Sequence, residues 1–289
     1  MRLDRPKSPR RILLATDLDP RSDRALDRAA LLAGEFSAEL FVAHVLEDIP
    51  DGEDEIPSWR RPPSLVEVAR RQLLRQVGAV AQKATILIEQ GEPAKAILAA
   101  AEREGCDLIV TGVAKEELFG RSSLGATVDG ILRGTGVPVL VVKSRASNPY
   151  RQIVVATDFS RYSRHALDTA AAFFPDRPLT LFHAYDAPMS LLSSDPDAYR
   201  QEWEEAARKE CANFLRDSSH DADQYIAFGA PDVVMHDYVL EKGVDLVVLG
   251  TRGRSGIGEF FLGSVAKSIV LAVPCDALLV RHREELEEA

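Results

Sequence analysis

The second half of this 289-residue sequence repeats the first half. ILLATDLDPRSDRALDRAA (12–30) matches IVVATDFSRYSRHALDTAA (153–171), which aligns Asp17 with Asp158. Shorter matches follow in the same order and at a nearly constant offset: EQGEPAKAI with AFGAPDVVM, CDLIVTG with VDLVVLG, and GVPVLVV with AVPCDALLV. Because a repeat at about half the chain length is too long for a solenoid unit, the sequence predicts two similar domains.

The boundary between the two halves lies in KSRASNPYR (143–151). This segment is polar and contains a proline, as is typical of a short linker between domains. We therefore place the first domain at residues 8–144 and the second at residues 150–283.

Each half alternates short apolar runs with helical patterns. In the first half the apolar runs are ILLAT, ELFVAHV, ATILIEQ, DLIVTG and PVLVV. Continuous apolar strands separated by helices are typical of a parallel sheet that is covered on both faces. With right-handed crossovers, the predicted fold class is α/β, with two tandem doubly wound five-stranded domains. Ligands of such sheets bind beyond the carboxyl ends of the strands, where the winding direction switches.

The last predicted strand of each half is an apolar edge. An isolated domain would leave PVLVV or DALLV exposed as a template for pairing with another strand. We therefore expect the two domains to pair within the chain through these strands. A homodimer is compatible with the sequence, but no residue argues for it.

Composition restricts the partners of the chain. Its 35 basic and 45 acidic residues give a net charge of −10, whereas nucleic acids and anionic membranes bind broad basic surfaces. No apolar run approaches the roughly 18 residues of a membrane span, and no apolar stretch follows the basic N-terminus as in a secretory signal. The three cysteines form no CxxC pair, and no cluster has metal-ligand spacing. We expect a soluble cytoplasmic protein that binds neither nucleic acid nor membrane, without a metal site.

A glycine-rich segment follows the fourth predicted strand of the second half. GTRGRSGIGEFFLGSVA (250–266) contains five glycines and leads into a helical pattern at Gly263 and Ser264. A glycine loop before a helix N-terminus offers backbone amides and the positive end of the helix dipole to a phosphate. Arg252 and Arg254 add positive charge. The segment therefore predicts a phosphate-binding loop.

The spacing Gly250-x2-Gly253-x9-Gly263-Ser264 resembles the ATP-binding signature of the universal stress protein family. The first strand ending in VATD, the serine-bearing helix after it, the GxP segment after the third strand and the PVLVV-like last strand also resemble this family. The resemblance covers nearly the whole chain twice, as in a tandem universal stress protein. It implies strand order 3-2-1-4-5, a nucleotide lying across the first and fourth strands, and pairing of the domains through their last strands.

Carried over residue by residue, the resemblance implies a complete ATP site in the second half. It implies that Asp158 meets the adenine or ribose, and that Ala156, Thr157 and Ala184 line the base pocket. It implies phosphate contacts from the following residues: Gly250, Gly253, Gly263, Ser264 and Val265. By their charge, Arg252 and Arg254 join this predicted ATP site. Whether Mg²⁺ accompanies the ATP is left open.

The first half departs from this pattern. Gly112 and Gly125 have the expected spacing, but Lys115 replaces the middle glycine and Ala126 replaces the serine. Two glutamates follow Lys115 directly, where they would repel a triphosphate. We therefore expect one nucleotide per chain, bound by the second half.

Some of these residues also have a purely structural interpretation. Asp17 and Asp158 could cap the helix after the first strand, since aspartate is favoured there. We interpret Ser163 as a structural residue of the early helix. His44 and His183 end matching second strands, and we interpret both as packed strand residues rather than catalysts.

The leading hypothesis is a nucleotide-dependent regulator of the stress response that binds ATP through its second domain. Three alternatives stay open: a slow ATPase or self-phosphorylating protein with Ser264 as acceptor, an enzyme of a related nucleotide-binding fold, and a structural interaction protein without a nucleotide. Against a related enzyme, the sequence has no HxGH-like or SGGxDS-like signature and no GxSxG elbow. We expect weak ATPase activity or autophosphorylation at most.

Overall fold

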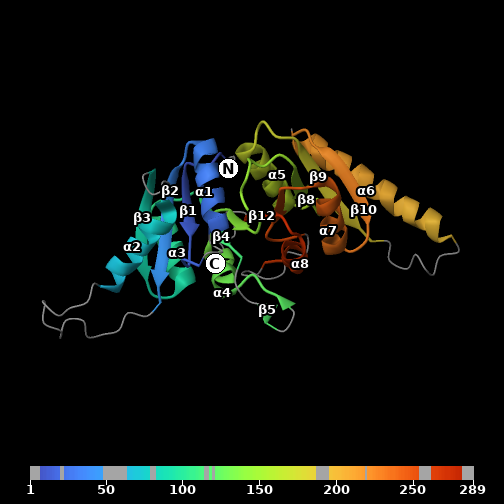
Figure 1. Ribbon diagram of the computed structural model, residues 1–289. Coiled ribbons are helices and arrows are strands. Elements are labelled where there is room, and N and C mark those ends of the chain that lie inside the picture. The colour runs from blue at the N-terminus through green and yellow to red at the C-terminus, as the bar shows by residue number, and fades with distance from the viewer. Residues whose placement is uncertain are drawn as a thin grey trace, which may run out of the picture. The chain divides into compact units, whose positions relative to one another are not determined.

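The computed structural model describes residues 7–19, 23–47, 64–78, 83–113, 117–118, 121–186, 195–218, 220–253 and 262–281. The chain divides into two compact units (Figure 1). We call Pro9–Pro149 the first unit, and Tyr150–Ala289 together with Met1–Ser8 the second unit.

The first unit is built on a parallel five-stranded sheet in the order β3-β2-β1-β4-β7. Its strands are β1 (Arg11–Ala15), β2 (Glu39–Leu46), β3 (Ala84–Gln90), β4 (Leu108–Gly112) and β7 (Val139–Val142). Its helices are α1 (Asp23–Phe36), α2 (Leu65–Val77), α3 (Pro93–Arg103) and α4 (Ala126–Gly134). A short antiparallel pair, β5 (Glu117–Leu118) and β6 (Arg121–Ser122), lies between β4 and α4 in the sequence.

The second unit repeats this arrangement with the order β10-β9-β8-β11-β12, again with parallel pairs. Its strands are β8 (Ile153–Ala156), β9 (Leu179–Tyr185), β10 (Asp223–Phe228), β11 (Leu246–Gly250) and β12 (Asp276–Val280). Its helices are α5 (Arg161–Phe173), α6 (Pro196–Ser218), α7 (Pro231–Lys242) and α8 (Ser264–Ala272). Both units therefore have strand order 3-2-1-4-5, and the predicted fold class is confirmed.

The continuous apolar runs become strands that are buried on both faces. In β8 and β11, Val155, Val247 and Val248 are all 0% exposed. Helix α5 packs on β8, β11 and β12, and it buries Ala166 and Ala170 at helical spacing. Full burial of one aliphatic side chain stabilises the fold by about 1.5–3 kcal/mol. The buried side chains therefore hold the sheet together and fix the positions at which its strands end.

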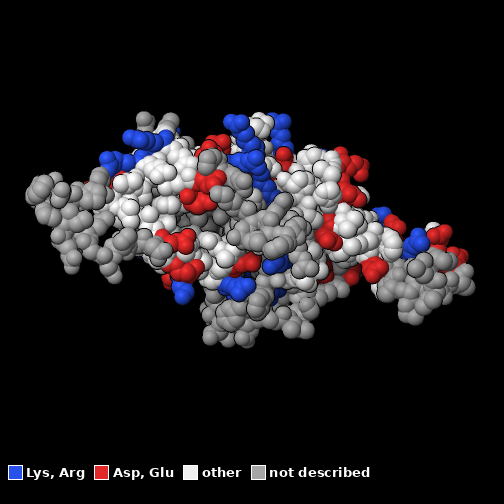
Figure 2. Space-filling model, turned by 60° about the horizontal axis from the view of Figure 1, so that its bottom comes forward, with Lys and Arg blue, Asp and Glu red and all other residues white. Residues whose placement is uncertain are grey.

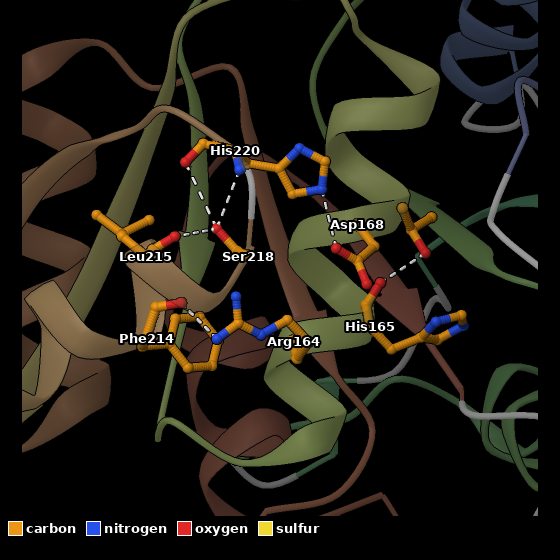
Figure 3. Close-up of polar contacts among 8 residues, drawn as sticks. Arg164, His165, Asp168, Phe214, Leu215, Ser218 and His220 are labelled. Carbon is orange, nitrogen blue, oxygen red and sulfur yellow. Dashed lines mark hydrogen bonds and ion pairs between the residues drawn. The ribbon is translucent and has the colours of Figure 1, made fainter. Parts of the chain in front are cut away.

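The C-terminal end of α6 is fastened to α5 (Figure 3). Arg164 of α5 donates through Nη2 to the carbonyl oxygen of Phe214, and its Cζ atom lies 3.7 Å from the centroid of the Phe214 ring. Nε2 of His220 lies 2.9 Å from Oδ1 of Asp168. Burial lowers the pKa of the Arg164 guanidinium from its ordinary value, and the charges of Asp168 and Asp217 act against that shift. These contacts hold α6 against the helix that follows the first strand of the unit.

The surface carries charges of both signs. On the face shown in Figure 2, small groups of Lys and Arg side chains lie among groups of Asp and Glu. Among the helices that the structure describes, none combines the length and the apolar composition needed to cross a bilayer.

Candidate functional site

A tight turn follows β8 at the carboxyl edge of the sheet. Oγ1 of Thr157 accepts a hydrogen bond from the amide of Phe159 at 2.9 Å, and Oδ1 of Asp158 accepts one from the amide of Ser160 at 3.1 Å. The backbone of Phe159 lies in the left-handed region, with φ of 62°. Because this conformation is unfavourable for a bulky residue, the turn depends on the groups that hold it.

Helix α5 is capped by Ser160 rather than by Asp158. The side chain of Ser160 accepts the amide hydrogen of Ser163 at 3.3 Å, whereas Asp158 binds the amide of the capping residue itself. The capping interpretation of Asp158 is therefore wrong. The structural interpretation of Ser163 is confirmed, since its hydroxyl accepts from the hydroxyl of Thr157 at 2.9 Å and donates to the carbonyl of Ser160 at 3.0 Å.

The end of β11 lies beside the start of α8. The amide of Thr251 donates to the carbonyl of Val280 on β12 at 3.0 Å, and the carbonyl of Thr251 accepts from the amide of Gly263 at 2.8 Å. Gly263 is the N-cap residue of α8. The two ends of the predicted phosphate loop are thus brought together, while its residues 254–261, Arg254 included, lie outside the described residues.

The first turn of α8 has amides available to a ligand. The first backbone bond of the helix runs from Lys267 to the carbonyl of Gly263 at 2.9 Å, and the amides of Ser264 and Val265 have no partner within the described part of the chain. Val265 is 52% exposed. Because Gly263 uses its own amide in the fold, the phosphate contacts of this stretch would come from Ser264 and Val265.

The two glycines after β11 are needed for close approach. A Cβ atom on Gly250 would lie 3.1 Å from the backbone carbon and oxygen of Tyr162, in the first turn of α5. A Cβ atom on Gly253 would lie 2.7 Å from Oδ2 of Asp158. Gly250 therefore lets the first turn of α5 pack closely on the end of β11. Gly253 places the backbone of the loop against the carboxylate of Asp158.

The residues expected to line the base pocket lie at the ends of adjacent strands. Ala156 ends β8, and Ala184 lies near the end of β9; both are half-buried. Thr157 is only 8% exposed, and its hydroxyl is bound inside the fold. Arg252 is half-buried in the loop after β11. Both alanines have small side chains and are partly exposed at this edge of the sheet.

Two cavities lie away from these residues. One of about 600 Å³ borders α2 in the first unit, and one of about 710 Å³ runs along α5 to the residues after α6 in the second. None of the residues predicted to bind the nucleotide lines either of them. Among the described residues, the candidate site is traced by the backbone groups at the ends of β8 and β11 and by Asp158.

The first unit has the same turn after β1. The amide of Leu18 donates to Oγ1 of Thr16 at 3.2 Å, the amide of Asp19 donates to Oδ1 of Asp17 at 3.0 Å, and φ of Leu18 is 61°. Its glycine packing differs, because a Cβ atom on Gly112 would meet nothing within 4 Å.

The start of α4 corresponds to the start of α8. Gly125 is its N-cap residue with φ of 87°, and Ala126 is its first residue. Lys115 and Glu116 lie outside the described residues, as does the side chain of Glu117. The effect of these sequence differences on nucleotide binding by the first unit therefore stays a prediction.

Two histidines hold these turns, and sequence reasoning did not find this role. Nδ1 of His183 lies 2.8 Å from the carbonyl oxygen of Thr157, and Nδ1 of His44 lies 2.9 Å from that of Thr16. The signal was present in the repeat, because the two histidines end matching strands. The matching histidines could be assigned a role only once the structure placed each ring beside the turn that it contacts.

Together these features define a tandem doubly wound α/β protein, whose second unit places a glycine loop and an acidic turn at its topological switch point. The chain belongs to the universal stress protein family, whose model matches residues 9–143 and again residues 149–281.

Relatives and solved structures agree with this assignment. A protein of Staphylococcus haemolyticus named as a universal stress protein is 29% identical over 150 residues, which cover 48% of this chain and 89% of that protein. A crystal structure of a functionally unknown protein from Pseudomonas aeruginosa PAO1 has a TM-score of 0.68 at 19% identity, covering 97% of this chain and 95% of that one. A universal stress protein from Archaeoglobus fulgidus has a TM-score of 0.64 at 21% identity, covering 96% and 97%. These structural likenesses show the fold of the whole chain.

Proposed function

We propose that the second unit binds ATP at the carboxyl ends of β8 and β11, and that the chain acts as an ATP-dependent regulator in the stress response. The observation that carries the proposal is the contact between the backbone of Gly253 and the carboxylate of Asp158. It joins the first and fourth strands of the sheet at the edge where doubly wound domains bind ligands.

The residues present fit a nucleotide. Asp158 would receive the ribose or the adenine edge, next to the small side chains of Ala156 and Ala184. The phosphates would lie against the amides of Gly253, Ser264 and Val265 and the hydroxyl of Ser264, where the dipole of α8 also favours negative charge. Arg252 and Arg254 would add counter-charge. Gly250 and Gly263 would act indirectly, since they shape the loop and cap the helix.

The proposal assigns one nucleotide to each chain. In the first unit Ala126 offers no hydroxyl at the helix start, and Lys115 places a side chain where the second unit has Gly253. The loss of one hydrogen bond to a charged group costs about 1.5–3 kcal/mol, which is roughly a ten- to hundredfold loss of affinity.

Calorimetric titration of the whole chain with ATP tests the proposal. We expect a stoichiometry of one, and we expect the double variant Gly253→Lys/Ser264→Ala to abolish binding. The control Gly112→Ala, at a position with open space around it, should bind as the wild type does. A stoichiometry of two, or undiminished binding by the double variant, would show that the site is wrongly assigned.

A further inference from the structure

His183, on strand β9, contacts the turn of residues 157–160 that follows the neighbouring strand β8. Its Nδ1 lies 2.8 Å from the carbonyl oxygen of Thr157, and because a carbonyl oxygen only accepts, Nδ1 is the donor. The ring of His183 also packs on the ring of Phe159, with the centroids 4.3 Å apart. One side chain therefore contacts the residue before Asp158 and the residue after it.

The hydrogen bond sets the direction of the peptide group between Thr157 and Asp158. A trans peptide is planar, and its C=O and N–H groups point in opposite directions. Strand β8 pairs with β9 on one side and with β11 on the other. A carbonyl bound by the ring of His183 is fixed in direction, and the amide of Asp158, on the opposite side of the same peptide group, is fixed with it.

The ring contact supports the strained residue of the turn. Phe159 has φ of 62°, and its ring is held between His183 and Phe214 of α6, whose ring centroid is 5.7 Å away. Phe214 in turn lies under the guanidinium of Arg164 (Figure 3). Because strained backbone persists only where its surroundings fix it, removal of the His183 contacts should loosen the turn.

The first unit contains the same device at a turn without a complete phosphate loop. His44 donates to the carbonyl of Thr16, and Leu18 has φ of 61°. Both histidines contact the carbonyl of the turn after the first strand of their unit, but Leu18 has no ring to match the contact between Phe159 and His183. The proposed nucleotide binds in only one unit. This makes His44 a matched control for His183.

We propose that His183 is a positioning residue for nucleotide binding, which orients the Asp158 turn from β9 without contacting the ligand itself. The proposal rests on the ATP site described above. It predicts that the imidazole donor at this position affects affinity and that the equivalent donor in the first unit does not.

Three variants of the whole chain test the proposal by calorimetric titration with ATP and by thermal unfolding. His183→Phe keeps a ring against Phe159 but removes the donor, and we expect ATP affinity to fall roughly three- to tenfold. His183→Asn places an amide nitrogen near the position of Nδ1, and it should recover affinity to within about threefold of the wild type. His44→Phe removes the matching donor to the carbonyl of Thr16, and it should leave ATP affinity unchanged.

A second measurement does not depend on the ligand. The amide of Phe159 donates to Oγ1 of Thr157, and its hydrogen exchange should speed up in His183→Phe and stay slow in His44→Phe. Unchanged exchange of this amide, unchanged ATP affinity in His183→Phe, or equal loss of affinity in His44→Phe would each overturn the positioning role. If the wild type itself binds no ATP, the proposed function fails, and the exchange measurement still decides whether His183 holds the turn.

Discussion

The backbone of Gly253 lies against the carboxylate of Asp158, so closely that a Cβ atom on the glycine would stand 2.7 Å from Oδ2. Rotation of the carboxylate would break a hydrogen bond, because its other oxygen accepts the amide hydrogen of Ser160 at 3.1 Å. These two residues belong to different strand ends, and their contact defines the edge of the sheet where we place the nucleotide.

Gly253→Ala should therefore weaken ATP binding. The added methyl group meets Oδ2 of Asp158 and forces the carboxylate to rotate away from the amide of Ser160. We expect affinity to fall roughly tenfold, because a rotated carboxylate no longer makes its hydrogen bond to the nucleotide, and such a bond contributes about 1.5–3 kcal/mol. Isothermal titration measures this directly. If this variant bound ATP with wild-type affinity, Asp158 would not be part of the binding site.

Gly250→Ala should lower the stability of the chain. Its Cβ atom would lie 3.1 Å from backbone atoms of Tyr162, which cannot move without shifting α5, and overpacking of this kind costs about 1–3 kcal/mol. The matched change Gly112→Ala in the first unit meets nothing within 4 Å, so its effect should stay within about 0.5 kcal/mol. Urea unfolding compares the two. Equal effects would contradict the difference in packing between the units.

Stability should fall at alkaline pH because of the buried thiols. Burial raises the pKa of Cys106 to about 12 and that of Cys211 to about 11, from an ordinary value of 9.0. The unfolded chain therefore loses these protons first, so the contribution is complete below pH 9 and is lost as the pH rises above it.

For Cys106 the loss at pH 10.5 relative to pH 8 should be about 2 kcal/mol. Cys106→Ala removes this part of the pH dependence, although the variant is less stable at every pH because it leaves a cavity. Urea unfolding of both proteins at the two pH values measures the difference. Parallel pH profiles would show that the thiol titrates normally in the fold.

ATP turnover by the purified chain should stay below about 1 per second, the lower end of the range typical of enzymes. The described residues at the loop provide backbone amides and the hydroxyl of Ser264, while the carboxylate of Asp158 accepts a backbone hydrogen bond at the turn. The amides and the hydroxyl can bind phosphate, and we expect the carboxylate, held in its turn, to make a poor base for water. Phosphate release under saturating ATP is the measurement, and turnover at enzymatic rates would show that the protein is a catalyst.

Much of the fold followed from local patterns in the sequence. The apolar runs and the order of the repeat predicted five parallel strands in each half, and the strand order expected from the resemblance is confirmed by the pairing of β1 with β2 and β4 and of β8 with β9 and β11. The expected pairing of the halves through PVLVV and DALLV stays a prediction. The phosphate contacts predicted from the glycine spacing stay a prediction, and among them the amide of Gly263 donates to the carbonyl of Thr251.

The sequence by itself determined the two α/β units, and it predicted the stretch of chain that holds a phosphate, because periodicity and glycine content are local properties. Only the tertiary structure decided which glycine faces Asp158, which residue caps α5, and that His183 holds the turn from another strand. These relationships join residues from separate strands and helices. They depend on the distances of closest approach between packed backbones, which no local pattern encodes.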